Sequence, residues 1–142
     1  MTATTTFASL IGAPGSNAPE SSLLPGIGVS TFRTAAAAGT LASFTATFNN
    51  IAPDAPFGSF EVVAWDNASG LYPTWLQASV AWQGGLIYGG RSQEVTLANI
   101  GGPVNPPPTM PPVSFQLSIP EPSAAVLMGL GAAAFLYAGR RK

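Results

Sequence analysis

Residues 41–50 read LASFTATFNN, and apolar and polar side chains alternate along this stretch. One side of the extended chain carries the apolar members, Ala42, Phe44, Ala46 and Phe48, and the other side carries serine and threonine. Side chains two residues apart share one face of a β-strand, so this period of two predicts a strand with one buried face. The stretch therefore indicates a β-protein.

The same alternation recurs at residues 113–119, where apolar side chains alternate with serine and glutamine. Shorter stretches rich in β-branched and aromatic residues predict further strands at 27–32, 59–66 and 92–100. Turn signals separate these stretches, at Asn49-Asn50, 53–56, 66–70, Gly84-Gly85 and Gly89-Gly90. Short strands at this spacing favour an all-β fold, namely a small antiparallel β-sandwich.

The residues from Tyr72 to Gly84 fit two different periods. Helical spacing relates Tyr72, Trp75, Leu76, Ser79 and Val80. Strand-like alternation relates Leu76, Ala78, Val80 and Trp82. Because Pro73 stands near the start and Gly84 just past the end, we predict a short helix near 73–83.

Composition excludes several classes of function. Charged residues make up 8% of the 142-residue chain, against about 25% in an average soluble domain. Cysteine and histidine are both absent, which removes thiol catalysis, cysteine or histidine zinc sites and histidine-dependent triads. Cations do not cluster before the last three residues, so no nucleic-acid partner is expected. We predict no cofactor and no metal.

The chain ends with IPEPSAAVLMGLGAAAFLYAGRRK at residues 119–142. Residues 124–139 carry no charge, and as a helix they would span roughly 24 Å, close to the ~30 Å hydrocarbon core of a bilayer. The long side chains of Arg140, Arg141 and Lys142 can extend to the headgroups. We predict a transmembrane helix at 124–139 with a cytoplasmic basic tail at 140–142, because basic flanks stay inside.

The order Pro120-Glu121-Pro122-Ser123, then an apolar helix, then Arg140-Arg141-Lys142 resembles the PEP-CTERM protein-sorting signal. This resemblance covers residues 120–142. It implies that exosortase, a membrane enzyme resembling a cysteine transpeptidase, reads the tail and removes it near Pro-Glu-Pro after export. It also implies an inner-membrane precursor whose ectodomain lies outside and then reaches the cell surface or extracellular matrix of a Gram-negative bacterium.

The ectodomain also resembles the small β-rich ectodomains that precede such tails. The similarity rests on AWD at 64–66, RSQEVTL at 91–97 and SFQLSIPEPS at 114–123. Proteins of this kind usually begin with a signal peptide and a first strand. Residues 1–15 lack the basic and apolar regions of a secretory signal peptide. By this comparison we expect both the signal peptide and the first strand to be missing, and the lack of that strand would leave one sheet edge open.

Three segments follow from these patterns. Residues 1–26 are expected to be irregular or a partial first strand. Residues 27–119 form the predicted sandwich and include a proline-rich, polyproline-like connector at 103–112. Residues 120–142 form the sorting signal, with its motif at 120–123.

The first functional hypothesis is a non-catalytic, exported surface or matrix protein whose partners are exosortase and the membrane. The alternative is a carbohydrate-binding module of the exopolysaccharide matrix, which would stack sugar rings on exposed aromatic side chains, Trp65, Tyr72, Trp75, Trp82 and Tyr88. An enzyme is not expected. The acids ahead of the sorting motif are Asp54 and Asp66, assigned to turns, and Glu20, Glu61 and Glu94, of which the last two are assigned to exposed strand positions.

Overall fold

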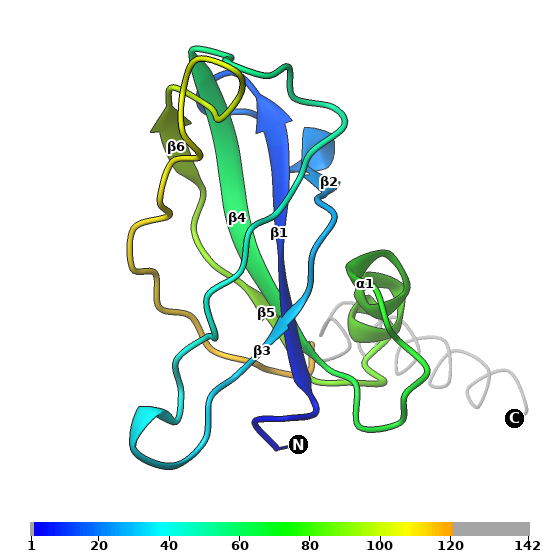
Figure 1. The fold of residues 1–142 in the computed structure, drawn as a ribbon. Helices are drawn as coiled ribbons and strands as arrows, with labels where there is room; N and C mark the ends of the chain where they lie inside the picture. The colour runs from blue at the N-terminus through cyan, green and yellow to red at the C-terminus, as the bar shows by residue number, and fades with distance from the viewer. Residues whose placement is uncertain (1, 121–142) are drawn as a thin grey trace, which may run out of the picture.

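Two long antiparallel strands form the centre of the fold in this computed structural model, which describes residues 2–120 (Figure 1). Strand β1 (Thr6–Pro14) pairs with β4 (Phe57–Asp66) from Thr6↔Asp66 to Pro14↔Gly58. Four short strands complete a six-stranded sheet. Along the outer edge of β1 lie β2 (Leu24–Pro25) and β3 (Ser30–Thr31), and along that of β4 lie β5 (Gly89–Arg91) and β6 (Val95–Ala98).

The predicted short helix is confirmed as α1 (Trp75–Gln83). Proline precedes it and Gly84 ends it, with the Gly84 N–H donating to the Val80 carbonyl at 3.0 Å. The strand interpretation of this stretch is wrong. Two short 3₁₀ turns, η1 (Glu20–Ser22) and η2 (Ala35–Ala37), complete the regular structure of the described residues.

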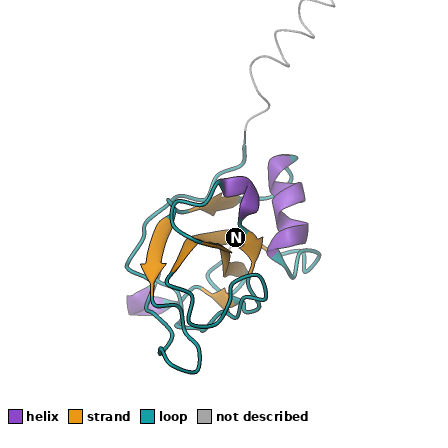
Figure 2. Cartoon of the chain, turned by 90° about the horizontal axis from the view of Figure 1, so that it is seen from above, coloured by secondary structure: helices purple, strands orange, loops and turns teal. Residues whose placement is uncertain are grey.

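One face of the sheet is turned toward α1 (Figure 2). This face carries the main core. Four aromatic rings lie in sequence on this side, with centroids 5.9, 5.7 and 5.8 Å apart, and we call Phe7, Trp65, Trp75 and Trp82 the aromatic row. Trp65 and Trp75 are buried and join Ile11, Val63 and Ala78 in one apolar cluster. The row therefore connects the long strands to the helix.

The opposite face of the sheet is covered by residues 41–50. Phe48 packs edge-to-face on Phe60 of β4 with ring centroids 5.2 Å apart, and Asn50 donates to the Gly12 carbonyl at 2.8 Å. The predicted alternation of burial holds, because Phe44, Ala46 and Phe48 are half-buried while the residues between them are exposed. Both faces of the long strands are therefore covered.

The strand predicted at 41–50 is not formed as a ladder. It makes two isolated bridges with the 27–32 stretch, Ile27↔Thr47 and Phe32↔Leu41. The pairing shifts by one residue between these bridges, and Gly28 there has a φ of 136°. A shift of this kind interrupts the hydrogen-bond ladder, as at a β-bulge.

The strand predicted at 113–119 likewise makes one bridge, Gly89↔Ser118. It follows the proline-rich segment and faces a strand of only three residues, so it has little backbone to pair with. Within residues 2–120 the strands thus form one antiparallel sheet, and the two packed sheets of a sandwich are not observed. The mostly-β class with one short helix is confirmed.

The N-terminal segment contributes a complete strand to the sheet. Residues 6–14 form a nine-residue strand at the centre of the sheet, within the segment expected to be irregular or a partial strand. It shows no alternation because both of its faces are buried, and doubly covered strands lack a polar side. Gly12 is required here, since a Cβ would lie 2.6 Å from the Phe60 ring.

The predicted transmembrane helix at 124–139 lies outside the described residues. Within residues 2–120, α1 is the only α-helix, and it is too short and too weakly apolar to cross a membrane.

Candidate functional site

The segment just before the predicted sorting motif is attached to the folded domain at Ser118. Its N–H donates to the Gly89 carbonyl at 2.9 Å, and its carbonyl accepts from the Gly89 N–H at 3.1 Å. The same carbonyl accepts from the Trp82 indole at 2.9 Å. Three hydrogen bonds from α1 and β5 thus fix the position from which the chain continues.

Two adjacent glycines in β5 make this attachment possible. A Cβ on Gly89 would lie 2.8 Å from the Trp82 ring, and one on Gly90 would lie 2.4 Å from the Gln116 carbonyl oxygen. Both contacts are closer than side chains tolerate, so the ring packs on one side of β5 and the C-terminal segment on the other. The sequence interpretation of Gly89-Gly90 as a turn is therefore wrong. Glycine inside a strand here marks a close approach of other groups.

Beyond Ser118 the chain passes the end of α1. A Cβ atom added to Gly85 would lie 3.5 Å from the Pro120 carbonyl oxygen and 3.8 Å from the Ile119 Cγ2 atom. Gly85 has a φ of 72°, which favours glycine, and its N–H donates to the Trp82 carbonyl at 2.8 Å. The turn after α1 and the last described residues are therefore in contact.

Residues 118–142 match the family described as the PEP-CTERM protein-sorting motif. The chain thus carries this sorting signal, which implies an exported, membrane-passing precursor that is targeted to an exosortase. No curated protein and no solved structure matches the chain. The match begins at Ser118, the residue that the three hydrogen bonds attach to the domain.

Of the predicted motif residues, the structure describes Pro120, which is half-buried. Glu121, Pro122 and Ser123 lie outside the described residues, as do Arg140, Arg141 and Lys142 of the basic tail. Sequence reasoning missed the attachment at Ser118 and its partners. The signal that could have revealed it was the pair of glycines inside an apolar stretch, Ile87 to Gly90.

The five aromatic residues proposed for sugar stacking do not form one exposed surface. Trp65 is 0% exposed and Trp75 is 7% exposed, so both are core residues. Tyr72 and Trp82 are half-buried, and Arg91 lies over the Trp82 ring at 5.4 Å. Tyr88 alone is exposed, at 45%. A surface hollow of about 240 Å³ has none of the five among its lining residues, which include Thr6, Phe32 and Leu117.

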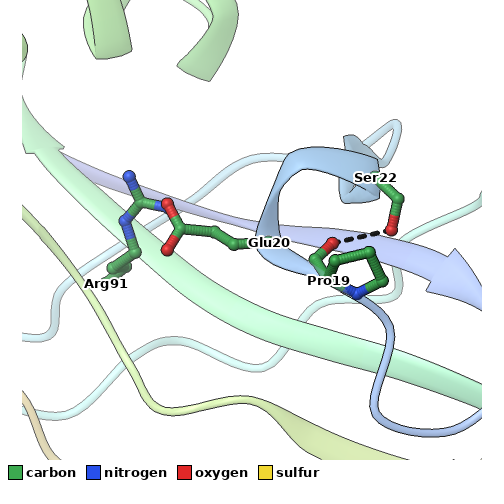
Figure 3. A network of polar contacts seen from close by, with 4 residues as sticks. All are labelled: Pro19, Glu20, Ser22 and Arg91. Carbon is green, nitrogen blue, oxygen red and sulfur yellow. Dashed lines mark hydrogen bonds and ion pairs between the residues drawn. The ribbon is translucent and has the colours of Figure 1, made fainter.

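Charged groups near the attachment site lie between η1 and β5. Figure 3 shows the Glu20 carboxylate and the Arg91 guanidinium pointing toward each other, and they form an ion pair. Within η1, the Ser22 hydroxyl donates to the Pro19 carbonyl at 2.7 Å. Because Glu20 is largely exposed, the pair contributes at most about 1 kcal/mol. Its main consequence is to hold the Arg91 side chain beside Trp82.

Glu61 of β4 is buried rather than exposed, contrary to the sequence prediction. It is 6% exposed, and its Oε2 atom has no hydrogen-bond partner among the described residues. Burial raises the pKa of this carboxyl above its usual 4.5, the nearby Arg91 opposes the rise, and Glu20 and Glu94 add to it. Folding therefore shifts Glu61 toward its neutral form relative to the unfolded chain.

We expect Glu61→Gln to stabilise the protein at neutral pH and not at pH 4. A carboxyl whose pKa is raised by folding costs no stability below its unfolded pKa, and its cost grows as the pH rises through the folded pKa. The relative gain should be on the order of 1 kcal/mol, because an unsatisfied buried group costs more when it is charged than when it is neutral. Urea unfolding followed by tryptophan fluorescence at the two pH values measures it.

The matched control is Glu94→Gln, at a half-exposed carboxylate that accepts a hydrogen bond from the Thr96 hydroxyl. It should change the free energy of unfolding little at either pH. An equal effect of Glu61→Gln at both pH values would contradict a raised pKa for Glu61.

Proposed function

We propose that this chain is a non-catalytic surface or extracellular-matrix protein of a Gram-negative bacterium, sorted through its C-terminal signal. In this proposal exosortase cleaves the precursor near Pro120-Glu121-Pro122. Residues 124–139 span the inner membrane until then, and Arg140 to Lys142 stay in the cytoplasm. The described domain lies outside the membrane.

The observation that carries the proposal is the sorting-motif match at 118–142, together with the attachment of its first residue to a folded domain. Ser118 is fixed and Pro120 lies beside the end of α1. Cleavage near the motif would therefore release the domain intact with few added residues. A separate domain followed directly by its sorting signal is what a sorted cargo requires.

The non-catalytic part of the proposal is supported by how the acids are used. The Asp54 carboxylate accepts hydrogen bonds from the N–H groups of Val104 and Asn105, at 2.7 to 3.2 Å. Asp66 accepts from the Ala68 N–H at 3.0 Å. These are the turn roles predicted from the sequence. Both carboxylates thus bond to backbone groups of nearby loops.

Binding of exopolysaccharide is the alternative function, and it has less support. With Trp65 and Trp75 buried, it would depend on Tyr88 and on half-buried Tyr72 and Trp82. The Trp82 ring already contacts Arg91, and its indole N–H is bonded to Ser118. Stacking on a sugar ring needs a free aromatic face, so we favour the sorted structural component.

The proposal is tested by producing the chain in cells with and without exosortase. We expect the surface form from exosortase-containing cells to end near residues 120–122. Without exosortase, the chain should keep Lys142 and remain in the membrane fraction. Mass spectrometry of the C-terminal peptides distinguishes the two. An intact Lys142 on the surface form in exosortase-containing cells would show that the tail is a plain anchor.

A further inference from the structure

The outward face of α1 carries large apolar side chains. Leu76 is 69% exposed and Val80 is 71% exposed, and residues four apart lie together on a helix surface. The buried side instead holds Trp75, Ala78 and Ala81. An exposed pair of large aliphatic residues on a helix of a small domain indicates a surface that meets something apolar.

This apolar face continues to the point where the chain leaves the domain. Leu86 is 73% exposed. A Cβ atom added to Gly84 would lie 3.3 Å from the Val80 carbonyl oxygen and 3.9 Å from the Leu86 Cγ atom, so Leu86 lies next to the end of α1. The next residue, Gly85, contacts Ile119 and Pro120 in the same way. We call Leu76, Val80, Leu86 and Ile119 the exit patch.

The segment that carries Leu76, Val80 and Leu86 is uncharged, and the Arg91–Glu20 ion pair lies beside Trp82. The sequence has no charged residue between Asp66 and Arg91, a stretch that contains all of α1 and the turn after it. The same stretch carries the exposed Tyr88 and the half-buried Trp82. Uncharged surface avoids the cost of removing ions from water, and tyrosine and tryptophan are the residues enriched where membranes meet water.

We propose that the exit patch rests on the outer lipid surface of the membrane while the tail is threaded through it. This inference relies on the proposed function, in which residues 124–139 span the bilayer. Three residues separate Pro120 from Ala124, and the four Cα-to-Cα steps from one to the other reach at most about 14 Å. The short peptide between Pro120 and Ala124 therefore keeps the end of α1 close to the bilayer. A soluble partner has no such connection that would hold it near α1.

The contact orients the domain for processing. With α1 lying against the headgroups, Ser118 to Pro120 face the membrane, and the peptide that follows stays at the depth where a membrane-embedded protease can reach it. A helix lying in the interface places its apolar side roughly 5–10 Å into the headgroup and acyl boundary. The exit patch residues are then the ones that meet lipid.

The test uses the full chain bound to vesicles of phosphatidylethanolamine and phosphatidylglycerol with brominated acyl chains. Because the chain contains no cysteine, Leu86→Cys accepts one environment-sensitive fluorophore. Ala98→Cys on exposed β6 gives the matched control. We expect bromine to quench most of the emission from position 86 and to leave position 98 unchanged. Adding Leu76→Ser and Val80→Ser should remove the quenching at 86 while the protein still floats with the vesicles.

Three other results would show that the exit patch does not contact lipid. Equal quenching at 86 and 98 in protein that floats with vesicles would overturn this inference and leave the proposed function standing. A label at 86 that is already shielded without vesicles, and is insensitive to bromine, would assign the patch to the tail or to a second copy of the chain. Failure to float at all would overturn both the contact and the membrane-spanning tail.

Discussion

Replacing Pro120 and Pro122 together by alanine should leave the C-terminal tail attached to most of the protein in exosortase-containing cells. Proline disfavours a helical conformation at the residue before it and lacks the N–H that a helix interior needs. Alanine favours the helix by about 3 kcal/mol per residue over proline, which is about a hundredfold in the ratio of helical to extended forms. The extended peptide that a protease binds would become rare.

The folded domain limits how far such a helix could grow. Ser118 is held in a β-bridge with Gly89 and by the Trp82 indole. The lengthened helix would therefore begin no earlier than about Ile119. The peptide before the membrane would then have almost no extended residues left. This is why we expect the double variant to affect processing more strongly than any other change in the tail.

Two controls separate processing from insertion and folding. Pro111→Ala with Pro112→Ala changes two exposed prolines outside the matched residues and should leave processing normal. Replacing Arg140, Arg141 and Lys142 by glutamate should disturb insertion instead, because the basic residues set the orientation. Mass spectrometry and cell fractionation measure both effects. Normal removal of the tail from the Pro120/Pro122 variant would reject the role of these prolines.

The short helix was predictable because local rules and tertiary packing agree there. Pro73 and Gly84 bracket residues that suit a helix, and α1 runs from Trp75 to Gln83. Its buried side was not predictable from the helical spacing, which relates the exposed Leu76 and Val80 to the buried Trp75. The core instead contains Ala78 and Ala81, whose small side chains let the helix pack close to the sheet.

Alternation predicted burial better than it predicted hydrogen bonding. At 41–50 the expected side chains are half-buried, but no ladder forms because the register shifts near Gly28. Conversely, β1 escaped the sequence analysis because both of its faces are covered and its pattern has no period. Pairing depends on which segments meet across the sheet, and a single sequence does not contain that information.

The candidate site likewise has one part that the sequence revealed and one part that only the fold revealed. The sorting motif is a linear signal, so residues 120–142 were recognisable from their order and spacing. Its attachment at Ser118 depends on Trp82 and Gly89, which are brought together by the fold. Exposure also comes from the fold, so the sequence could not separate buried Trp65 from exposed Tyr88.

Trp65→Ala should cost the domain about 3–5 kcal/mol of unfolding free energy, the usual cost of removing a buried tryptophan. Trp65 is fully buried and contacts Phe7 and Trp75 in the aromatic row. Its indole donates to the Tyr72 carbonyl at 2.7 Å. A domain of this size has about 5–15 kcal/mol of stability in all, so the variant should lose a large share of its stability.

Two matched variants locate the source of the loss in urea unfolding experiments. Trp65→Phe keeps a ring in the core and removes the hydrogen bond, so about 1 kcal/mol of its cost should come from that lost bond. Tyr88→Ala removes an exposed aromatic residue and should change stability by less than about 0.5 kcal/mol. A loss from Trp65→Ala no larger than that from Tyr88→Ala would contradict the assigned core.

The same substitution should also release the segment that leads into the sorting motif. Trp65 packs on Trp75, Trp75 packs on Trp82, and Trp82 donates to Ser118. When the Trp65 ring is removed, Trp75 loses the surface on which it packs, and Trp82 in turn loses part of its support. Hydrogen exchange at the Ser118 amide should therefore accelerate in Trp65→Ala even under conditions where β1 and β4 remain paired. Unchanged exchange at Ser118 in a folded Trp65→Ala domain would show that the aromatic row does not couple the core to the exit of the tail.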